Sequence, residues 1–401
     1  MKFGIIKERK NPPDKRVVFS PEKLQELIRK YPSAKFVVES SDIRVFSDLA
    51  YKNAGFQVVS DMSDCDILLG VKEVPVEALI PNKKYFFFSH TIKKQPYNRN
   101  LLQAILAKNI ELYDHETIVK ENGARLIGFG RYAGIVGVYN GFRAIGLKAN
   151  QFQLPKAATL INQQSLIAEL QKINLPNLKI LLTGNGKVAY GAREMLDAMN
   201  NKQVSVDEYL HQNFSEPVFC FADVLDYNKR KDGKIFDNID FYNHPEAYES
   251  DFLRFAKVTD FFIAGHFYGN GAPVFFTKGD AKKPEFKIRF IADISCDING
   301  PIPTTIRAST IEHPFYGYHP EKEIEVNFYD ENAIVVMAVD NLPCELPKDA
   351  SEGFGEMFLE NVIPAFFDGD KNGILSRAKI TENGRLTERF SYLQDYVDGR
   401  E

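Results

Sequence analysis

Residues 66–97 of the chain read DILLGVKEVPVEALIPNKKYFFFSHTIKKQPY. This stretch contains two short apolar runs, residues 67–71 and 85–88, and each is bounded by proline, asparagine or charged residues, as a buried strand is. Lys72 directly follows the first run, and His90 lies two residues after the second. In a parallel α/β sheet, the carboxyl ends of neighbouring strands meet at the ligand crevice. We therefore expect Lys72 and His90 to face one pocket.

A lysine and a histidine in one pocket can divide proton transfers between them, because burial and neighbouring charges tune their pKa values. Lys72 and His90 are therefore the candidate catalytic residues. The ordinary alternative is a solvated lysine at a strand end and a loop histidine without a catalytic role. Spacing alone favours that alternative, and the motifs described below reverse the preference.

Composition bounds the class of protein. The chain has 401 residues, 44% hydrophobic and 26% charged, with a formal net charge of −4. A soluble protein of two domains is expected, because single hydrophobic cores stop growing at about 250–300 residues. The near-neutral charge gives no reason to expect a nucleic acid or a membrane surface as partner, and no apolar run approaches the ~18–20 residues that span a bilayer.

The four cysteines are scattered without CxxC spacing, so we expect neither a metal site nor a disulfide framework. The first residues show no signal-peptide pattern. A reduced, cytoplasmic setting is therefore the expectation. The sequence contains no signal from which to predict an oligomeric state.

Strand and helix patterns alternate along the first 113 residues. Short apolar runs typical of strands occur at residues 2–6, 36–39 and 55–59, and Ser20-Pro21 marks a helix start. This alternation predicts a βαβ sheet. Further along, Gly134, Gly137 and Gly141 would lie on nearly one face of a helix, where glycine permits close approach. We expect this helix to pack two domains together, with a domain boundary near residues 150–155.

The second core begins near residue 157, and it contains a glycine motif. The buried run 178–183 leads into Gly184-Asn185-Gly186, with Gly191 five residues later inside a predicted helix. In this strand–turn–helix context the first two glycines allow a tight turn and close approach to a pyrophosphate, and the third allows helix–strand contact. Dinucleotide binding is the favoured interpretation, and a purely structural turn is the alternative.

Two further cofactor contacts follow from the second core. An acid that binds the adenosine ribose is expected about 20 residues after the glycine turn, and Asp207 lies there after the short run 204–206. Asp207 would favour NAD, whereas Ser205 in that place would tolerate a 2′-phosphate. Phe267 follows the buried run 260–264 and could pack on a cofactor ring, with core packing as the alternative.

The chain resembles the lysine-forming saccharopine dehydrogenases along essentially its whole length. It is most similar to the lysine–ketoglutarate reductase half of bifunctional aminoadipic semialdehyde synthase. The motifs that carry the resemblance, in order, are FGIIKERKNPPDKRVVFSP (3–21), GVKEVP (70–75), FFFSHTIKKQPY (86–97), ELYDHETIVKENGARLIGFGRYAGIVG (111–137), IADISCDINGPIP (291–303), TIEHPFYGY (310–318) and AVDNLPCELPKDASEGFGEMF (338–358). The first motif alone is shared with alanine dehydrogenase and transhydrogenase.

The resemblance implies roles for residues near the opening stretch. Lys72 and His90 match the family's acid–base pair. Glu73 and Glu116 match carboxylates beside that pair, which would set its charge because a neighbouring carboxylate raises the pKa of a lysine or histidine. The positions expected to contact the substrates are Arg16, Gln95, Arg125 and Phe129. The two arginines suit the carboxylates of saccharopine, because a guanidinium binds a carboxylate through paired hydrogen bonds.

The resemblance also implies the cofactor contacts of the second domain. Gly184 and Gly186 match the phosphate turn. The expected nicotinamide-side strand end comprises Val339, Asp340, Asn341 and Leu342. Lys187 and Tyr190 depart from the fungal version of the turn, and the reductase half of the bifunctional enzymes prefers NADP. NADP is therefore slightly favoured over NAD.

Together these observations predict an α/β protein of two Rossmann-like domains with parallel sheets and an interdomain cleft. Residues 1–147 with 343–401 form the expected substrate and catalytic domain, and residues 148–342 the dinucleotide-binding domain. The expected reaction is the reversible reductive condensation of lysine with 2-oxoglutarate to saccharopine. The alternatives are an amino-acid dehydrogenase of the alanine dehydrogenase type and a cofactor-binding relative without turnover. The presence of both Lys72 and His90 argues against the relative without turnover.

Overall fold

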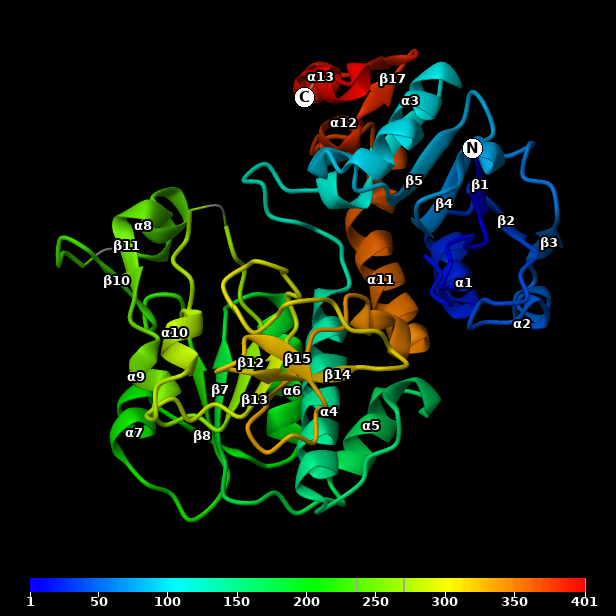
Figure 1. The fold of residues 1–401 in the computed structure, drawn as a ribbon. Coiled ribbons are helices and arrows are strands. Elements are labelled where there is room, and N and C mark those ends of the chain that lie inside the picture. The colour runs from blue at the N-terminus through cyan, green and yellow to red at the C-terminus, as the bar shows by residue number, and fades with distance from the viewer. Residues whose placement is uncertain (236, 270, 401) are drawn as a thin grey trace. The chain divides into compact units, whose positions relative to one another are not determined.

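The chain divides into two compact units in a computed structural model that describes residues 1–235, 237–269 and 271–400. The first unit comprises residues 1–129 and 347–401, and the second comprises residues 130–346 (Figure 1). The sequence-based boundaries at 147/148 and 342/343 differ from these. The structure places the whole of the helix that begins at Gly130 in the second unit.

The first unit takes its strands from the N-terminal stretch and several of its helices from the C-terminal one. Its elements are β1 (Lys2–Ile5), α1 (Pro21–Lys30), β2 (Lys35–Glu39), α2 (Asp48–Asn53), β3 (Gln57–Val59), β4 (Ile67–Lys72), η1 (Val76–Ala78), β5 (Lys84–Phe88), η2 (Thr91–Lys93), η3 (Pro96–Asn98), α3 (Arg99–Ala107), β6 (Glu111–Asp114), η4 (His115–Thr117), α11 (Pro347–Asn361), η8 (Ile363–Phe366), α12 (Ile374–Ala378), β17 (Thr381–Glu382), β18 (Arg385–Leu386), η9 (Glu388–Leu393) and α13 (Gln394–Asp398).

The six main strands of this unit form one parallel sheet in the order β3-β2-β1-β4-β5-β6. This is the doubly wound order in which the chain reverses direction across the sheet between β1 and β4. The predicted βαβ sheet is therefore confirmed. Ligands of such sheets bind outside the carboxyl ends of the strands at that reversal.

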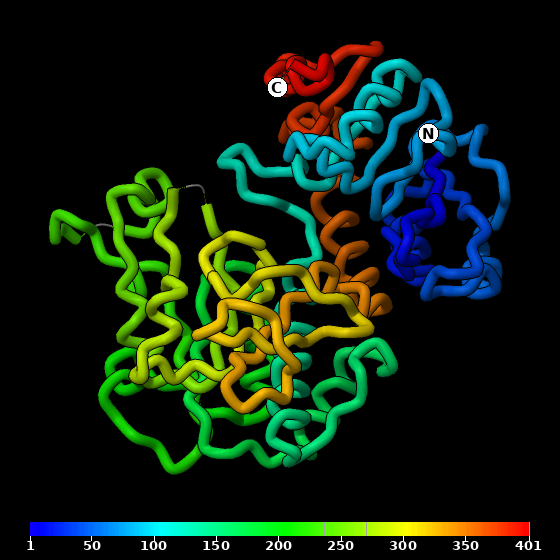
Figure 2. The backbone as a smooth tube through the Cα atoms, viewed as in Figure 1, coloured from blue at the N-terminus to red at the C-terminus, as the bar shows by residue number. Residues whose placement is uncertain are grey.

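Local signals in the sequence explain where the first helix begins and how the C-terminal stretch joins the unit. The Ser20 hydroxyl accepts a hydrogen bond from the Lys23 amide, with Pro21 at the first helical position. Helix α11 buries Phe354 and Phe358 against aromatic rings of the first sheet, and Figure 2 shows the C-terminal segment returning beside α3. The tail after residue 374 includes the short β17–β18 hairpin between α12 and α13.

The second unit contains the glycine turn and a larger sheet. Its elements are α4 (Gly130–Ala149), η5 (Ala157–Thr159), α5 (Gln163–Leu170), β7 (Lys179–Thr183), α6 (Lys187–Ala198), β8 (Lys202–Val204), α7 (Val206–His211), β9 (Val218–Ala222), β10 (Asn228–Arg230), α8 (Asn238–Asn243), η6 (Pro245–Ala247), β11 (Tyr248–Ser250), α9 (Leu253–Ala256), β12 (Phe261–Ala264), α10 (Lys278–Ala281), β13 (Phe290–Asp293), β14 (Phe315–His319), β15 (Ile324–Val326), β16 (Ile334–Met337) and η7 (Leu342–Glu345).

The second sheet has the order β15-β14-β16-β13-β12-β7-β9-β8. The six strands from β16 to β8 are parallel, and β14 and β15 add an antiparallel edge. One detail of this order matters for the cofactor: β7 lies between β12 and β9, and β8 lies beyond β9 at the edge. Among the helices described in either unit, none combines the length and apolar character needed to cross a membrane.

Glycines hold α4 against α6 inside the second unit. A Cβ atom added at Gly134 would lie 2.0 Å from the Val188 carbonyl oxygen, and one at Gly191 would lie 2.0 Å from the Arg131 carbonyl oxygen. Gly141 lies against the Phe261 ring in the same way. The glycine face of α4 was expected to pack two domains together, and it instead packs the helix on elements of its own unit. Gly191, expected to allow helix–strand contact, allows helix–helix contact.

We expect Gly134→Ala to lower the stability of the second unit. The added methyl group meets backbone atoms that cannot rotate away, so the overpacking cost of about 1–3 kcal/mol outweighs the ~1 kcal/mol gain in helix propensity. Thermal unfolding followed by circular dichroism measures the effect. The control is Gly279→Ala in α10, where the nearest atom to the added Cβ is 3.6 Å away. Equal melting temperatures for the two variants would contradict the packing argument.

Candidate functional site

The loop after β1 reaches across to the end of β4. The buried carboxyl group of Glu8 accepts hydrogen bonds from the Val71 amide at 2.7 Å and the Lys72 amide at 2.8 Å. Burial, together with the nearby Asp14, raises the pKa of Glu8 to about 8. Glu8 therefore fixes the strand end that carries Lys72, at the point where the sheet order reverses. The sequence analysis did not single out Glu8.

Lys72 and His90 follow neighbouring strands at the same edge of the first sheet. Lys72, the last residue of β4, pairs in register with Phe88, the last residue of β5, and His90 follows two residues later. The rings of Phe88 and His90 stack with centroids 6.1 Å apart. The structure thus brings the two residues to one sheet edge, as the strand-end argument requires.

A buried carboxylate orients His90. The His90 Nδ1 atom lies 3.0 Å from Glu116 Oε2, while Lys93 and Arg125 pair with the other oxygen at 3.3 and 2.9 Å. Burial opposes ionisation of Glu116, yet the hydrogen bond from His90 and the surrounding positive charges lower its pKa to about 2. Glu116 is therefore an anion that holds three basic side chains around it.

Asp114 fixes the backbone of the same loop. Its buried carboxylate accepts hydrogen bonds from the amides of Ser89 at 2.9 Å, His90 at 3.2 Å and Glu116 at 2.7 Å. His90 has a left-handed backbone with φ of 55°, a conformation that a non-glycine residue rarely adopts without support. Burial raises the pKa of Asp114. These bonds supply the support for His90, and Asp114 too was missed from the sequence.

Glu73 and His115 differ in their partners: the first forms an ion pair and the second a hydrogen bond to the backbone. Glu73 accepts an ion pair from Lys10 at 3.0 Å, and although burial works to raise its pKa, Lys10 and the charge of Lys72 lower the pKa overall. His115 is fully buried and donates a hydrogen bond from Nε2 to the Gly70 carbonyl at 2.8 Å, and burial lowers its pKa to about 4. His115 is thus a neutral structural histidine, and Glu73 is a carboxylate whose pKa the Lys72 charge helps to lower.

The predicted substrate contacts occupy three different settings. Arg16 is 2% exposed, makes a paired hydrogen bond with Asp14 at 3.0 and 2.6 Å, and lies 4.2 Å over the Phe129 ring. Arg125 keeps about half of its side chain exposed beside Glu116. Gln95 is exposed, and its carbonyl oxygen accepts a hydrogen bond from the Tyr396 hydroxyl at 2.5 Å. Phe129 stacks on Phe354 and lies near Phe88, whose ring stacks with that of His90.

The glycine turn of the second unit suits a phosphate group. Gly184 has φ of +110°, and a Cβ there would meet the Gly265 carbonyl oxygen at 2.5 Å. Only glycine fits this position. A Cβ added at Gly186 would meet nothing within 4 Å, so space is open in front of the N-terminus of α6. A dinucleotide pyrophosphate fits that space and the N-terminal amides behind it.

Asp207 and Asp223 lie at different distances from the glycine turn along the second sheet. Asp207 lies in α7 beyond the edge strand, with 88% of its side chain exposed and an ion pair to His211 at 3.1 Å. Asp223 directly follows β9, the strand beside β7, and its Oδ2 accepts a hydrogen bond from Asn185 of the glycine turn at 3.1 Å. The prediction took Asp207 because it follows the next strand-like run in the sequence, whereas the sheet places β9 between that strand, β8, and β7. The run VFCFA before Asp223 was the sequence signal that could have revealed it.

The other predicted cofactor contacts follow strands parallel to β7. Phe267 comes after β12 and is 76% exposed, so it does not pack in the core. Val339 and Leu342 are buried after β16, and Asp340 is exposed between them. Asn341 precedes the η7 turn. The carboxyl ends of β7, β12 and β16 share one sheet edge, which gathers these residues and the glycine turn on the same side of the second unit.

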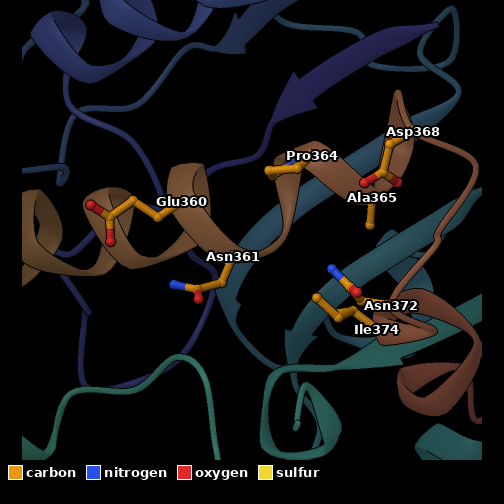
Figure 3. A pocket seen from close by; sticks show the side chains of 7 residues that line it. All are labelled: Glu360, Asn361, Pro364, Ala365, Asp368, Asn372 and Ile374. Carbon is orange, nitrogen blue, oxygen red and sulfur yellow. The ribbon is translucent and has the colours of Figure 1, made fainter. Parts of the chain in front are cut away.

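A hollow of about 130 Å³ in the first unit lies apart from these residues. It is bounded by the end of α11, by η8 and by the start of α12, as Figure 3 shows. Its lining residues are Glu360, Asn361, Pro364, Ala365, Asp368, Asn372 and Ile374. None of them was predicted for the site, and we assign no chemistry to this hollow.

The chain has two α/β units, each built around a parallel sheet whose strand ends carry the residues described above. Residues 4–136 match the family model described as alanine dehydrogenase/PNT, N-terminal domain. The chain is also similar over its whole length to the structure of an L-alanine dehydrogenase, with a TM-score of 0.64 and 16% identity, covering all of both chains. That likeness shows the fold alone.

Two named relatives match most of the chain. It is 27% identical to the alpha-aminoadipic semialdehyde synthase of Arabidopsis thaliana, over 97% of this chain and 41% of that protein. It is 26% identical to the saccharopine dehydrogenase (NAD⁺, L-lysine-forming) of Schizosaccharomyces pombe, over 86% of this chain and 88% of that one. The chain spans less than half the length of the synthase it matches. The resemblance seen in the motifs is confirmed: lysine-forming saccharopine dehydrogenases are homologues of this chain.

Glu116→Gln should destabilise the first unit in a pH-dependent way. A carboxylate whose folded-state pKa is lowered from 4.5 to about 2 contributes stability above pH 4.5, and that contribution is lost as the pH falls towards 2. The difference from wild type is expected to be on the order of 2–3 kcal/mol at pH 7 and to shrink below pH 4.5. Unfolding at pH 7, 5, 4 and 3 tests this. The control is Glu121→Gln at an exposed position, and a pH-independent difference for Glu116→Gln would contradict the assignment.

Proposed function

We propose that the chain is a nicotinamide-dependent oxidoreductase that joins the side-chain amine of L-lysine to 2-oxoglutarate and reduces the product to saccharopine, reversibly. The observation that carries the proposal is the pair Lys72 and His90 on adjacent strand ends, with Glu116 bonded to the imidazole. Reductive condensation needs such a pair, because it adds an amine to a ketone, expels water and protonates a nitrogen. The homologues with this activity in their names support the proposal.

The residues of the first unit divide the proton transfers. In the condensation direction the amine adds to the ketone carbon to give a carbinolamine, which loses water to form an imine. One of Lys72 and His90 serves the carbinolamine oxygen as it leaves as water, and the other handles the proton on the nitrogen. A bound reduced nicotinamide supplies the hydride that converts the imine to the secondary amine. Glu116 keeps His90 oriented, and Glu73 lies beside Lys72 as its counter-charge.

The substrates themselves explain the basic side chains at this edge. Saccharopine carries three carboxylates, and Arg16 and Arg125 are the proposed partners for two of them, because guanidinium groups bind carboxylates with paired hydrogen bonds. Arg125 is half exposed beside Glu116, and Arg16 is held by Asp14 over Phe129. Phe129 and Gln95 complete the proposed contacts. In this proposal the first unit holds the substrates and the second binds the dinucleotide.

We propose NAD as the preferred cofactor. The motif resemblance slightly favours NADP, whereas the position of Asp223 beside the glycine turn favours NAD, because a carboxylate accepts ribose hydroxyls and repels a 2′-phosphate. The backbone turn at Gly184 and Gly186 and the N-terminus of α6 would hold the pyrophosphate. Phe267 and the segment from Val339 to Leu342 are the proposed nicotinamide-side contacts.

An initial-rate panel tests the proposed reaction. Lysine with 2-oxoglutarate should oxidise NADH, which is measured as the loss of absorbance at about 340 nm. Ammonia with pyruvate should give little or no turnover. Turnover with ammonia and pyruvate alone would instead identify an amino-acid dehydrogenase of the alanine dehydrogenase type. No turnover with either pair, despite dinucleotide binding, would identify a cofactor-binding relative.

Lys72→Met should lower kcat with lysine and 2-oxoglutarate by about 10²-fold or more, the usual size of a general acid–base contribution. Lys120→Met, which changes an exposed lysine of the same unit, should leave the rate unchanged. Steady-state kinetics at several pH values make the comparison. A Lys72→Met rate within a few-fold of wild type would end the acid–base assignment.

Asp223→Ser should lower kcat/KM for NADH by about tenfold and leave that for NADPH unchanged or higher. The substitution removes both the acceptor for the ribose hydroxyls and the charge that repels a 2′-phosphate. Asp207→Ser, in the position predicted from the sequence, is the matched control and should change neither value. An effect of Asp207→Ser equal to that of Asp223→Ser would restore the sequence-based assignment.

A further inference from the structure

The carboxylate of Asp223 accepts hydrogen bonds from neighbouring groups of the protein. Its Oδ2 atom accepts hydrogen bonds from Asn185 of the glycine turn at 3.1 Å and from Asn238 at 2.7 Å, and its Oδ1 atom accepts one from the Val224 amide at 2.7 Å. Asn238 is the first residue of helix α8, in the segment between β9 and β12. Two side-chain amides, one from the glycine turn and one from α8, therefore donate to the same oxygen of Asp223.

These bonds limit what Asp223 can offer a ribose. A carboxylate oxygen accepts about two hydrogen bonds, so Oδ2 is fully engaged and Oδ1 has one position left. The adenosine ribose of a dinucleotide presents two neighbouring hydroxyl groups. Asp223 alone can accept from one of them while its amide partners stay in place, and the second hydroxyl requires another acceptor at the same point.

Asn238 is the side chain that can supply it. Its Nδ2 atom is already within 2.7 Å of Asp223, so its own Oδ1 atom lies beside the carboxylate. The corresponding oxygen of Asn185 already accepts a hydrogen bond from the Tyr190 hydroxyl at 3.0 Å. Among the residues that the structure describes, no side-chain or backbone donor is hydrogen-bonded to the Asn238 oxygen.

We propose that Asn238 is a specificity-determining residue for the cofactor, which binds the adenosine ribose diol jointly with Asp223. This rests on the proposed function, since it requires a nicotinamide dinucleotide in the second unit. The pair accepts one ribose hydroxyl on Asp223 and the other on Asn238. A 2′-phosphate would lose both contacts and face the carboxylate, so Asn238 contributes to NADH binding and not to NADPH binding.

Equilibrium binding to the full chain tests the proposal, with NADH and NADPH titrated by nicotinamide fluorescence. Asn238→Ala should weaken NADH binding by about fivefold, the loss of one hydrogen bond, and change NADPH binding less than twofold. Asn238→Asp keeps the shape of the side chain but puts a second carboxylate beside Asp223, so it should weaken NADH binding further. Asn243→Ala, at an exposed asparagine of the same helix, is the matched control and should change neither affinity.

Cofactor analogues locate the contact. NAD⁺ lacking the adenosine 2′-hydroxyl or 3′-hydroxyl should bind the wild type more weakly than NAD⁺, and for one of the two analogues that penalty should disappear in Asn238→Ala. Equal weakening of NADH and NADPH by Asn238→Ala, or an unchanged penalty for both analogues, would overturn the proposal while the dinucleotide function stands. A wild type that binds neither NADH nor NADPH would instead overturn the proposed function, and this inference with it.

Discussion

The first unit depends on a carboxyl group that joins two strands which are not hydrogen-bonded at their ends. Glu8 follows β1 and accepts hydrogen bonds from the buried amide of Val71 and the partly buried amide of Lys72. Because an unpaired buried amide costs about as much as a lost hydrogen bond, this contact settles where β4 ends.

Three carboxylates near the strand ends of the first sheet differ in the groups that they bind. Asp114 is buried, and its carboxylate oxygens accept hydrogen bonds from backbone amides. Its role is therefore to fix the loop conformation. Glu116 is buried as an anion among three basic side chains, and Glu73 is paired with Lys10. Carboxylates of the protein thereby partly neutralise the basic residues that would meet the carboxylates of a substrate. This arrangement reduces their mutual repulsion before any substrate is present.

Much of this organisation could be read from the sequence where the signal was local. The apolar runs before Lys72 and before Ser89-His90 predicted two neighbouring parallel strands, and the strand–glycine–helix pattern at Gly184 predicted the turn. What the sequence did not reveal depended on contacts between distant residues. Asp207 was chosen because it follows the next strand in the chain, whereas β9 occupies the place beside β7, and no local pattern reveals which strands are neighbours. Helix α4 was divided between the domains for the same reason, because its partners α6 and β12 lie 40 or more residues ahead.

The first unit is built from two stretches of chain that enclose the second in the sequence. The aromatic wall supplied by Phe354 and Phe358 is synthesised only after the whole of residues 130–346. Since domains tend to fold as units while the chain is made, the second unit can complete its core first. Until α11 is synthesised, the sheet that carries Lys72 and His90 has its aromatic face uncovered. Ribosome-bound chains that end shortly after residue 346 would therefore expose that face, and would be the stage at which this protein most needs a chaperone.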